Sequence, residues 1–209
     1  MDNSREFWSL QPVIPVVVID DVESAVPLAN ALVDGGLPRI EITLRTKAAL
    51  GAIEKISKEV PKALVGAGTV LNKKNLDDAI NAGAGYIVSP GTTATLRDEL
   101  KKIAIPSLPG AATVSEAMEL MAAGFKVAKF FPAADSGGVN MLKSISSVLQ
   151  DVSFCPTGGI SLSTYKDYLA LPNVVCVGGS WVAPKDLIAS KNWSAITKLA
   201  EEVSQKEGK

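Results

Sequence analysis

One lysine lies inside an apolar run, where a charged side chain is unexpected. Apolar residues surround Lys129 in segment 127–132, and Pro132 ends the strand that this segment predicts. A strand lysine usually lies at a sheet edge, where its ammonium group reaches water. A central strand of a barrel offers no such exit, and desolvation there disfavours the ammonium form. Lys129 is therefore a candidate amine nucleophile, the group that forms a Schiff base with a carbonyl substrate.

A second apolar segment carries charges at alternate positions. In residues 39–45 the even positions are apolar and are predicted to face surrounding helices, since side chains alternate along a strand. The odd positions Glu41, Thr43 and Arg45 are then directed inward, near the end of the strand. A buried Glu–Arg pair that sets only the strand register would explain them. The alternative is a functional carboxylate, because unpaired buried charges cost several kcal/mol per ion.

Two glycine doublets follow the last two predicted strands. Thr157 precedes Gly158 and Gly159, and Ser180 follows Gly178 and Gly179. Glycine doublets are common in turns, but backbone N–H groups after the seventh and eighth strands of an α/β barrel often bind phosphate. We therefore expect a phosphate site at these two loops.

The glycines of residues 66–71 do not form a dinucleotide-binding motif. The fingerprint G-x-G-x-x-G requires glycine at position 71, which is Leu71. These glycines are expected to allow a close approach at the end of the third strand, with the Thr69 hydroxyl toward the mouth. Pro90, in segment 89–91, ends the fourth strand in a similar place.

The elements that position these residues recur at an even spacing. Eight short apolar runs begin near Val13, Arg39, Ala63, Tyr86, Ile105, Lys126, Val152 and Val174. Segments with helical periodicity separate them, and glycines at 35–36, 83 and 124 end helices. This alternation predicts a parallel α/β fold. Eight units of about 26 residues, from 209/8, favour a (β/α)8 TIM barrel over an open doubly wound sheet.

The chain is expected to form a single domain over residues 1–209. The barrel is predicted over about 12–203, after a short N-terminal helix, and residues 204–209 form a frayed tail. The lysine pairs at 73–74 and 101–102 are expected on solvated helix faces.

Composition excludes several classes of function. The chain has no histidine, which excludes Ser-His-Asp sites, imidazole acid–base chemistry and His-ligated zinc. With 21 Lys and Arg against 22 Asp and Glu, it offers no basic field for nucleic acid. Cys155 and Cys176 lie in apolar runs and are expected to be reduced core residues. No signal peptide, membrane span, metal-ligand cluster or cofactor motif is found, so we expect a cytoplasmic protein.

Two longer segments carry a resemblance to a known family. Residues 36–45 and 124–133 resemble the segments that bear the catalytic glutamate and the Schiff-base lysine in 2-keto-3-deoxy-6-phosphogluconate (KDPG) aldolases. That family shares its chemistry with 4-hydroxy-2-oxoglutarate (KHG) aldolases. The resemblance implies a class I aldolase, a carbon–carbon lyase that acts on a 2-keto acid or sugar-acid phosphate without metal or cofactor. It also implies a homotrimer and a place in the Entner–Doudoroff route.

The resemblance further implies a role for each site residue. Lys129 forms the Schiff base with the C2 carbonyl, and Glu41 is the general acid and base. Arg45 and Thr69 bind the substrate carboxylate. The pocket walls are expected at Pro90 and Phe131, and the phosphate contacts at Thr157, Gly158, Gly159, Gly178, Gly179 and Ser180.

Other functions remain open at this point. The sequence does not separate a KDPG aldolase from an aldolase for the C4-epimeric 2-keto-3-deoxy-6-phosphogalactonate, because stereochemical preference depends on a few contacts at the mouth of the pocket. A phosphate-binding barrel acting as an epimerase or decarboxylase is a further alternative, although such enzymes usually recruit histidine or a metal. A non-catalytic metabolite-binding barrel is the third alternative, but it would bear the cost of burying the charges of Glu41 and Lys129 for binding alone.

Overall fold

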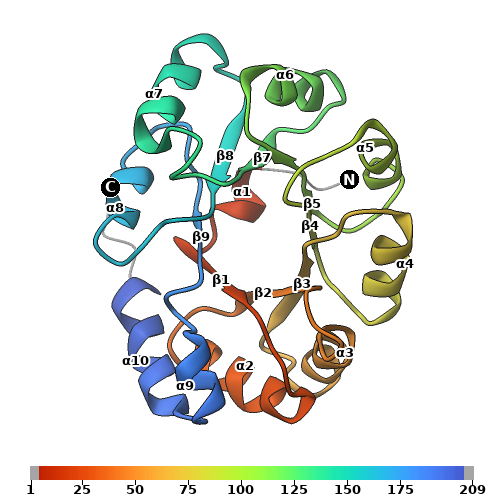
Figure 1. Cartoon of the computed structure of the whole chain (residues 1–209), viewed down its shortest axis with the longest axis vertical. Coiled ribbons are helices and arrows are strands. Elements are labelled where there is room, and N and C mark those ends of the chain that lie inside the picture. The colour runs from red at the N-terminus through yellow and green to blue at the C-terminus, as the bar shows by residue number, and fades with distance from the viewer. Residues whose placement is uncertain (1–4, 205–209) are drawn as a thin grey trace.

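A computed structural model describes residues 5–204 as parallel strands with helices packed around them (Figure 1). The strands are β1 (Val13–Val17), β2 (Arg39–Thr43), β3 (Leu64–Gly68), β4 (Ile87–Val88), β5 (Ser107–Leu108), β6 (Gly110–Ala111), β7 (Val127–Phe130), β8 (Ser153–Pro156) and β9 (Val177–Gly179). One curled sheet has six strands in the order β5-β4-β3-β2-β1-β9, and a second has the order β6-β7-β8. The predicted parallel α/β class is confirmed.

Helices connect successive strands and cover their outer side. They are α1 (Arg5–Trp8), the 3-10 turn η1 (Val22–Ser24), α2 (Ala25–Asp34), α3 (Ala49–Glu59), α4 (Lys73–Asn81), α5 (Ala94–Leu100), α6 (Val114–Ala122), α7 (Gly138–Val148), α8 (Tyr165–Leu169), α9 (Lys185–Ala189) and α10 (Trp193–Ser204). Side chains of Asn72 and Thr93 cap the starts of α4 and α5. Gly36, Gly83 and Gly124 follow helices with φ of 85°, 90° and 96°, as the sequence predicts.

The strand count differs from the prediction at one place. The expected fifth strand is divided into β5 and β6 by Pro109, which has no N–H to donate to a sheet. Its carbonyl still accepts a hydrogen bond of 2.8 Å from the Lys129 amide on β7. At the other junction between the sheets, single parallel bridges join Phe154 to Val174 and Thr157 to Gly178.

The apolar core has two layers, which follow the alternation of the strands. Ile40, Ile42 and Phe130 belong to the large cluster between strands and helices. A smaller cluster lies on the opposite side of the strands and includes Val127, Tyr86 and Trp8 of α1. The Trp8 and Tyr86 rings meet edge to face, with centroids 5.6 Å apart, and Figure 1 shows α1 between the two sheets. The inner cluster therefore fills one end of the interior.

Several smaller predictions can be compared directly with the structure. Cys155 and Cys176 are free, buried and part of the inner cluster, which confirms them as core residues. Ser204, where the frayed tail is predicted to begin, is the last residue of α10, whereas 205–209 lie outside the described residues. No helix within residues 5–204 has the length and apolar character needed to cross a membrane.

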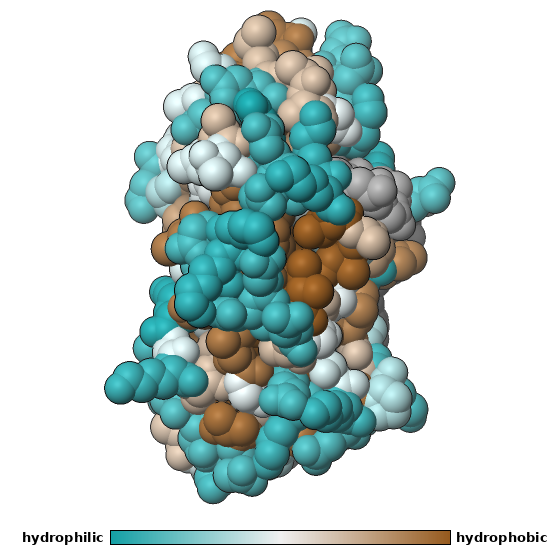
Figure 2. Space-filling view, turned by 90° about the vertical axis from the view of Figure 1, so that its right-hand side faces the viewer, coloured by the Kyte–Doolittle hydropathy of each residue, from teal (hydrophilic) through white to brown (hydrophobic). Residues whose placement is uncertain are grey.

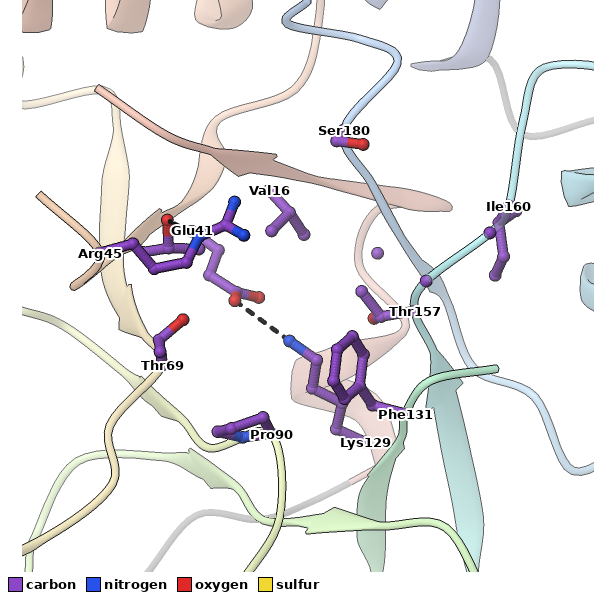
Figure 3. Close-up of a pocket in the computed structure, with 14 residues that line it drawn as sticks. Val16, Glu41, Arg45, Thr69, Pro90, Lys129, Phe131, Thr157, Ile160 and Ser180 are labelled. Carbon is purple, nitrogen blue, oxygen red and sulfur yellow. Dashed lines mark hydrogen bonds and ion pairs between the residues drawn. The ribbon is translucent and has the colours of Figure 1, made fainter. Parts of the chain in front are cut away.

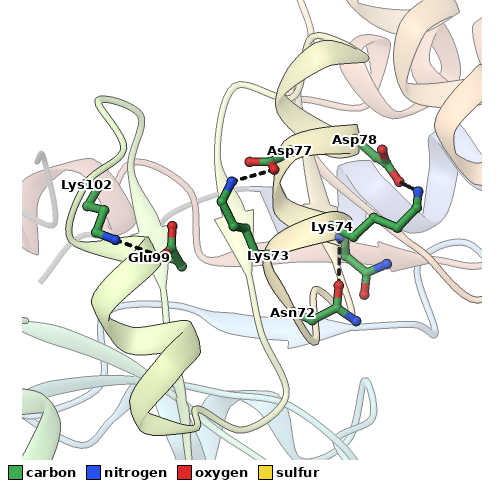
Figure 4. A network of polar contacts seen from close by, with 8 residues as sticks. Asn72, Lys73, Lys74, Asp77, Asp78, Glu99 and Lys102 are labelled. Carbon is green, nitrogen blue, oxygen red and sulfur yellow. Dashed lines mark hydrogen bonds and ion pairs between the residues drawn. The ribbon is translucent and has the colours of Figure 1, made fainter.

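Charged side chains project into solvent around α4 and α5 (Figure 4). Three ion pairs of 2.6 to 2.7 Å are formed there, Lys73–Asp77, Lys74–Asp78 and Lys102–Glu99. Exposed pairs of this kind contribute about 0 to 1 kcal/mol each. The expected solvated faces are confirmed. Figure 2 shows this side of the molecule as mostly polar, with an apolar patch among the polar side chains.

Candidate active site

A pocket of about 180 Å³ opens where the strands end at their C-terminal side. It is lined by Val16, Glu41, Thr43, Arg45, Thr69, Pro90, Lys129, Phe131, Thr157, Gly158, Gly159, Ile160, Gly178 and Ser180. The structure thus brings together every predicted site residue except Gly179. Val16 and Ile160 were not predicted, because apolar residues in a strand or a loop carry no signal that separates a pocket wall from the core.

Lys129 and Glu41 meet at the centre of the pocket (Figure 3). Nζ of Lys129 donates a hydrogen bond of 3.2 Å to Oε1 of Glu41, and the two side chains are only 5% and 4% exposed. The lysine comes from β7 and the glutamate from β2, in different sheets. Nζ also lies 5.5 Å from the ring centroid of Phe131. A buried carboxylate and a buried amine are therefore close enough to exchange a proton.

This pairing decides between the two interpretations of the charged strand. Within residues 5–204 Glu41 forms its ion pair with Lys129, and no ion pair joins it to Arg45. The interpretation as a Glu–Arg pair that only sets the register is therefore wrong. The inward direction of Glu41, Thr43 and Arg45 is confirmed, since all three line the pocket.

Glycines of β3 make room for the Glu41 side chain and for the ring of Tyr86. A Cβ placed on Gly68 would lie 2.7 Å from both Cγ and Cδ of Glu41, and closer still to Oε1. At Gly66 a Cβ would overlap the ring of Tyr86. Carbon atoms in favourable contact are about 3.5 to 4.0 Å apart. The predicted close approach at the end of the third strand is thus that of Glu41 and Tyr86.

Arg45 and Thr69 lie on the Glu41 side of the pocket (Figure 3). Arg45 follows β2, and its Nε donates to Oγ1 of Thr43 at 3.3 Å. Thr69 has a φ of 60°, a left-handed conformation that β-branched residues rarely adopt. Its neighbours hold it in place, since the Gly68 carbonyl accepts from Leu44 N at 2.8 Å and Val70 N donates to Val88 at 3.2 Å.

The loop after β8 and the end of β9, where the two glycines predicted to follow the last strand lie within it, form the remaining wall. Gly158 and Gly159 have φ of 100° and 71°, which explains the need for glycine at both positions. Gly178 faces the pocket beside Thr157, whose hydroxyl occupies the space where a Cβ would be. Gly179 does not line the pocket. Its missing side chain leaves room for the ring of Trp181, and its predicted phosphate contact stays a prediction.

Burial is the main cause of the altered pKa of the Tyr86 hydroxyl, which lies in the inner cluster. Burial raises the pKa of Tyr86 well above its usual value, and the Glu41 carboxylate adds to that effect. The Tyr86 hydroxyl thus remains protonated and provides a neutral floor. Among the described residues, no group of three or more His, Cys, Asp or Glu side chains is placed to hold a metal ion.

Comparisons with known proteins agree with this geometry. The family model described as KDPG and KHG aldolase matches residues 5–199. The chain is 51% identical over 200 residues to the KHG/KDPG aldolase of Escherichia coli K12, covering 96% of this chain and 94% of that protein. It is 49% identical over 200 residues to the 2-dehydro-3-deoxy-phosphogluconate aldolase of Pseudoalteromonas atlantica, covering 96% and 93%.

A solved structure is similar over nearly the same length. The KDPG aldolase of Legionella pneumophila, with pyruvate captured at low pH as a covalent carbinolamine intermediate, superimposes with a TM-score of 0.94 at 48% identity. The match covers 96% of this chain and 98% of the other. The two folds therefore agree over nearly the whole of both chains.

Proposed function

This chain belongs to the KDPG and KHG aldolase family, and we propose that it cleaves KDPG to pyruvate and glyceraldehyde 3-phosphate through a Schiff base on Lys129. The observation that carries the proposal is the buried contact of 3.2 Å between the Lys129 amine and the Glu41 carboxylate. A buried amine with a proton acceptor at this distance is the arrangement that imine chemistry requires.

The first half of the reaction forms the imine. Lys129 transfers a proton to Glu41, and the neutral amine adds to the C2 carbonyl of the 2-keto acid. The C2 hydroxyl of the resulting carbinolamine is then protonated and leaves as water, which produces a protonated imine. In this proposal Glu41, whose Oε1 lies 3.2 Å from Nζ, gives the C2 hydroxyl the proton that it took from Lys129.

The second half breaks the carbon–carbon bond. Glu41 removes the proton of the C4 hydroxyl, directly or through a water molecule, and the C3–C4 electron pair moves onto the imine as an enamine. The C4 oxygen becomes the aldehyde of glyceraldehyde 3-phosphate. Protonation at C3 and hydrolysis of the imine then release pyruvate and restore Lys129.

The other lining residues bind the two ends of the substrate. The guanidinium of Arg45 and the hydroxyl of Thr69 bind the C1 carboxylate. The backbone around Gly158, Gly159 and Gly178, together with Ser180, binds the C6 phosphate, since glycine allows close approach of N–H groups. Pro90 and Phe131 form walls of the pocket, and Thr157 provides a further phosphate contact.

Reductive trapping tests the proposal. Incubation with pyruvate and borohydride is expected to leave one pyruvate-derived adduct on Lys129, located by intact mass and peptide mapping. Lys129→Met should abolish the adduct, and Lys126→Met, three residues earlier, should not. Glu41→Gln should still form the adduct but cleave KDPG slowly. An absent adduct would refute the aldolase proposal and favour an epimerase or decarboxylase.

Cleavage of 4-hydroxy-2-oxoglutarate to pyruvate and glyoxylate is a second candidate activity. The relative from Escherichia coli bears both substrates in its name, KHG/KDPG aldolase, at 51% identity. This substrate has no phosphate and would not use the phosphate loops. Values of kcat/KM for KDPG, its C4 epimer and 4-hydroxy-2-oxoglutarate rank the three activities.

We further propose a closed (β/α)8 barrel for the single domain of residues 1–209. The hydrogen bond from Lys129 N to Pro109 and the bridge between Thr157 and Gly178 support closure at the two junctions between the sheets. A homotrimer in the cytoplasm is proposed from the family resemblance, and the apolar patch in Figure 2 offers a surface for contact between copies. Light scattering measures the assembly, and cell fractionation the location.

A further inference from the structure

The hydroxyl of Thr43 connects the cation of the pocket to the neighbouring strand. Thr43 ends β2 and is 3% exposed. Its Oγ1 donates a hydrogen bond of 2.8 Å to the Val17 carbonyl of β1 and accepts one of 3.3 Å from Nε of Arg45. A hydroxyl has one proton and a guanidinium has only donors, so the two bonds run in compatible directions.

Among the described residues, Arg45 has no other side-chain partner. Within residues 5–204 no carboxylate forms an ion pair with its guanidinium, and Thr43 is the one side chain that hydrogen-bonds it. The Arg45 amide also donates to the Thr43 carbonyl at 2.7 Å. Since Nε is the nitrogen that Thr43 holds, both terminal nitrogens remain available. Figure 3 shows the guanidinium of Arg45 directed into the pocket.

Thr43 also lies between two groups of opposite charge. Glu41, Thr43 and Arg45 occupy successive inward positions of one strand and the turn that follows it. A mobile Arg45 would be attracted to the Glu41 carboxylate, because opposite charges at low dielectric attract strongly. In the structure Glu41 instead contacts Lys129 at 3.2 Å.

We propose that Thr43 is a positioning residue for the aldolase reaction. It orients the guanidinium of Arg45 through Nε, so that the two terminal nitrogens receive the carboxylate of the 2-keto acid. It thereby also keeps Arg45 away from Glu41, which stays paired with Lys129. In this proposal Thr43 acts through Arg45 and makes no contact of its own with the substrate. This inference rests on the proposed function, in which Arg45 binds the substrate carboxylate.

Three variants of Thr43 separate its hydroxyl from its bulk. Thr43→Val and Thr43→Ala remove the hydroxyl, and Thr43→Ser keeps it. The first two are expected to raise the KM for KDPG, and the pyruvate concentration that gives half-maximal borohydride trapping, by about tenfold, the scale of one hydrogen bond to a charged group. The kcat should change less than about threefold. Thr43→Ser should resemble the unaltered protein. If Thr43→Val does not fold, Thr43→Ala provides the same comparison.

A double-mutant cycle with Arg45→Met shows whether Thr43 acts through Arg45. Arg45→Met alone should raise both quantities further than Thr43→Val, and Thr43→Val should add nothing in the Arg45→Met background. A merely structural role would give equal effects in both backgrounds and overturn the inference. The inference is also overturned if Arg45→Met raises the KM and Thr43→Val leaves it unchanged. If Arg45→Met itself leaves the KM unchanged, the proposed role of Arg45 fails instead, and the inference is refuted with it.

Discussion

Replacing Gly68 with alanine tests whether the position of the Glu41 carboxylate depends on the missing side chain of Gly68. Gly68 is a strand residue whose φ lies outside the left-handed region, so alanine adopts its backbone conformation without strain. The added Cβ would lie 2.7 Å from Cγ and Cδ of Glu41. Since favourable carbon contacts begin at about 3.5 Å, Glu41 has to retreat by about 0.8 Å, the difference between these distances.

A displacement of that size is large for acid–base catalysis. Misplacing a reacting group by about 1 Å reduces the rate by about 100-fold, and Glu41 is only 3.2 Å from the Lys129 amine. We therefore expect Gly68→Ala to lower kcat/KM for KDPG by about 100-fold. The end of the glutamate is flexible, so the free energy of unfolding should fall by no more than about 1 to 3 kcal/mol, the usual cost of overpacking.

The assay couples the release of glyceraldehyde 3-phosphate to the oxidation of a nicotinamide cofactor, with urea unfolding in parallel. Gly51→Ala is the matched control. Gly51 lies in α3, lines no part of the pocket, and an added Cβ would only approach Val22 at 3.2 Å. It should retain full activity. Activity of Gly68→Ala within about threefold of the unaltered protein would refute the reasoning that an added Cβ displaces Glu41.

Two further predictions concern strain and titration. Thr69→Gly relieves the strain of a β-branched residue at φ 60°, because glycine adopts this conformation readily. The free energy of unfolding should therefore stay equal or rise by about 1 kcal/mol, while loss of the hydroxyl raises the KM for pyruvate. A clear loss of stability in urea would contradict the assignment of strain to Thr69. Hydrogen bonding to Cys155 and burial raise the pKa of the Cys176 thiol well above its usual value, so the folded protein retains a proton that the unfolded chain releases. Stability present below the ordinary thiol pKa of about 8.5 should then be lost as the pH rises beyond it. The measurement is the urea midpoint as a function of pH, and Cys176→Ala should lose less stability at high pH than the unaltered protein. Identical pH profiles for the two proteins would contradict the role of the Cys176 thiol.

The alternation of side chains along two strands was sufficient to direct the reactive groups. Strand period is a local property of the backbone, so apolar Ile40 and Ile42 already place Glu41 on the opposite face of β2. The same argument directed Lys129 inward from β7. The eight strand positions, the glycines after helices and the class of fold follow from equally local patterns. Similarity to aldolases then supplied a role for each residue.

Tertiary structure decided which of these groups meet. Lys129 and Glu41 are 88 positions apart and belong to different sheets, so their contact of 3.2 Å depends on how the sheets curl and face each other. Thr43 lines the same pocket, but its bonds to Val17 and Arg45 depend on rotamers that no spacing specifies.

The glycine doublet at the end of β9 shows the same difference between what the sequence and the structure determine. Gly178 and Gly179 look alike as a motif, yet Gly178 faces the pocket and Gly179 lies against Trp181. Adjacent residues of a strand point to opposite faces, so this doublet, which lies within β9, directs only one of its members to the pocket. Residue types thus revealed the chemistry available to this chain, because alternation and burial act over a few residues. The contacts that turn it into a site join distant strands, and only the folded chain defines them.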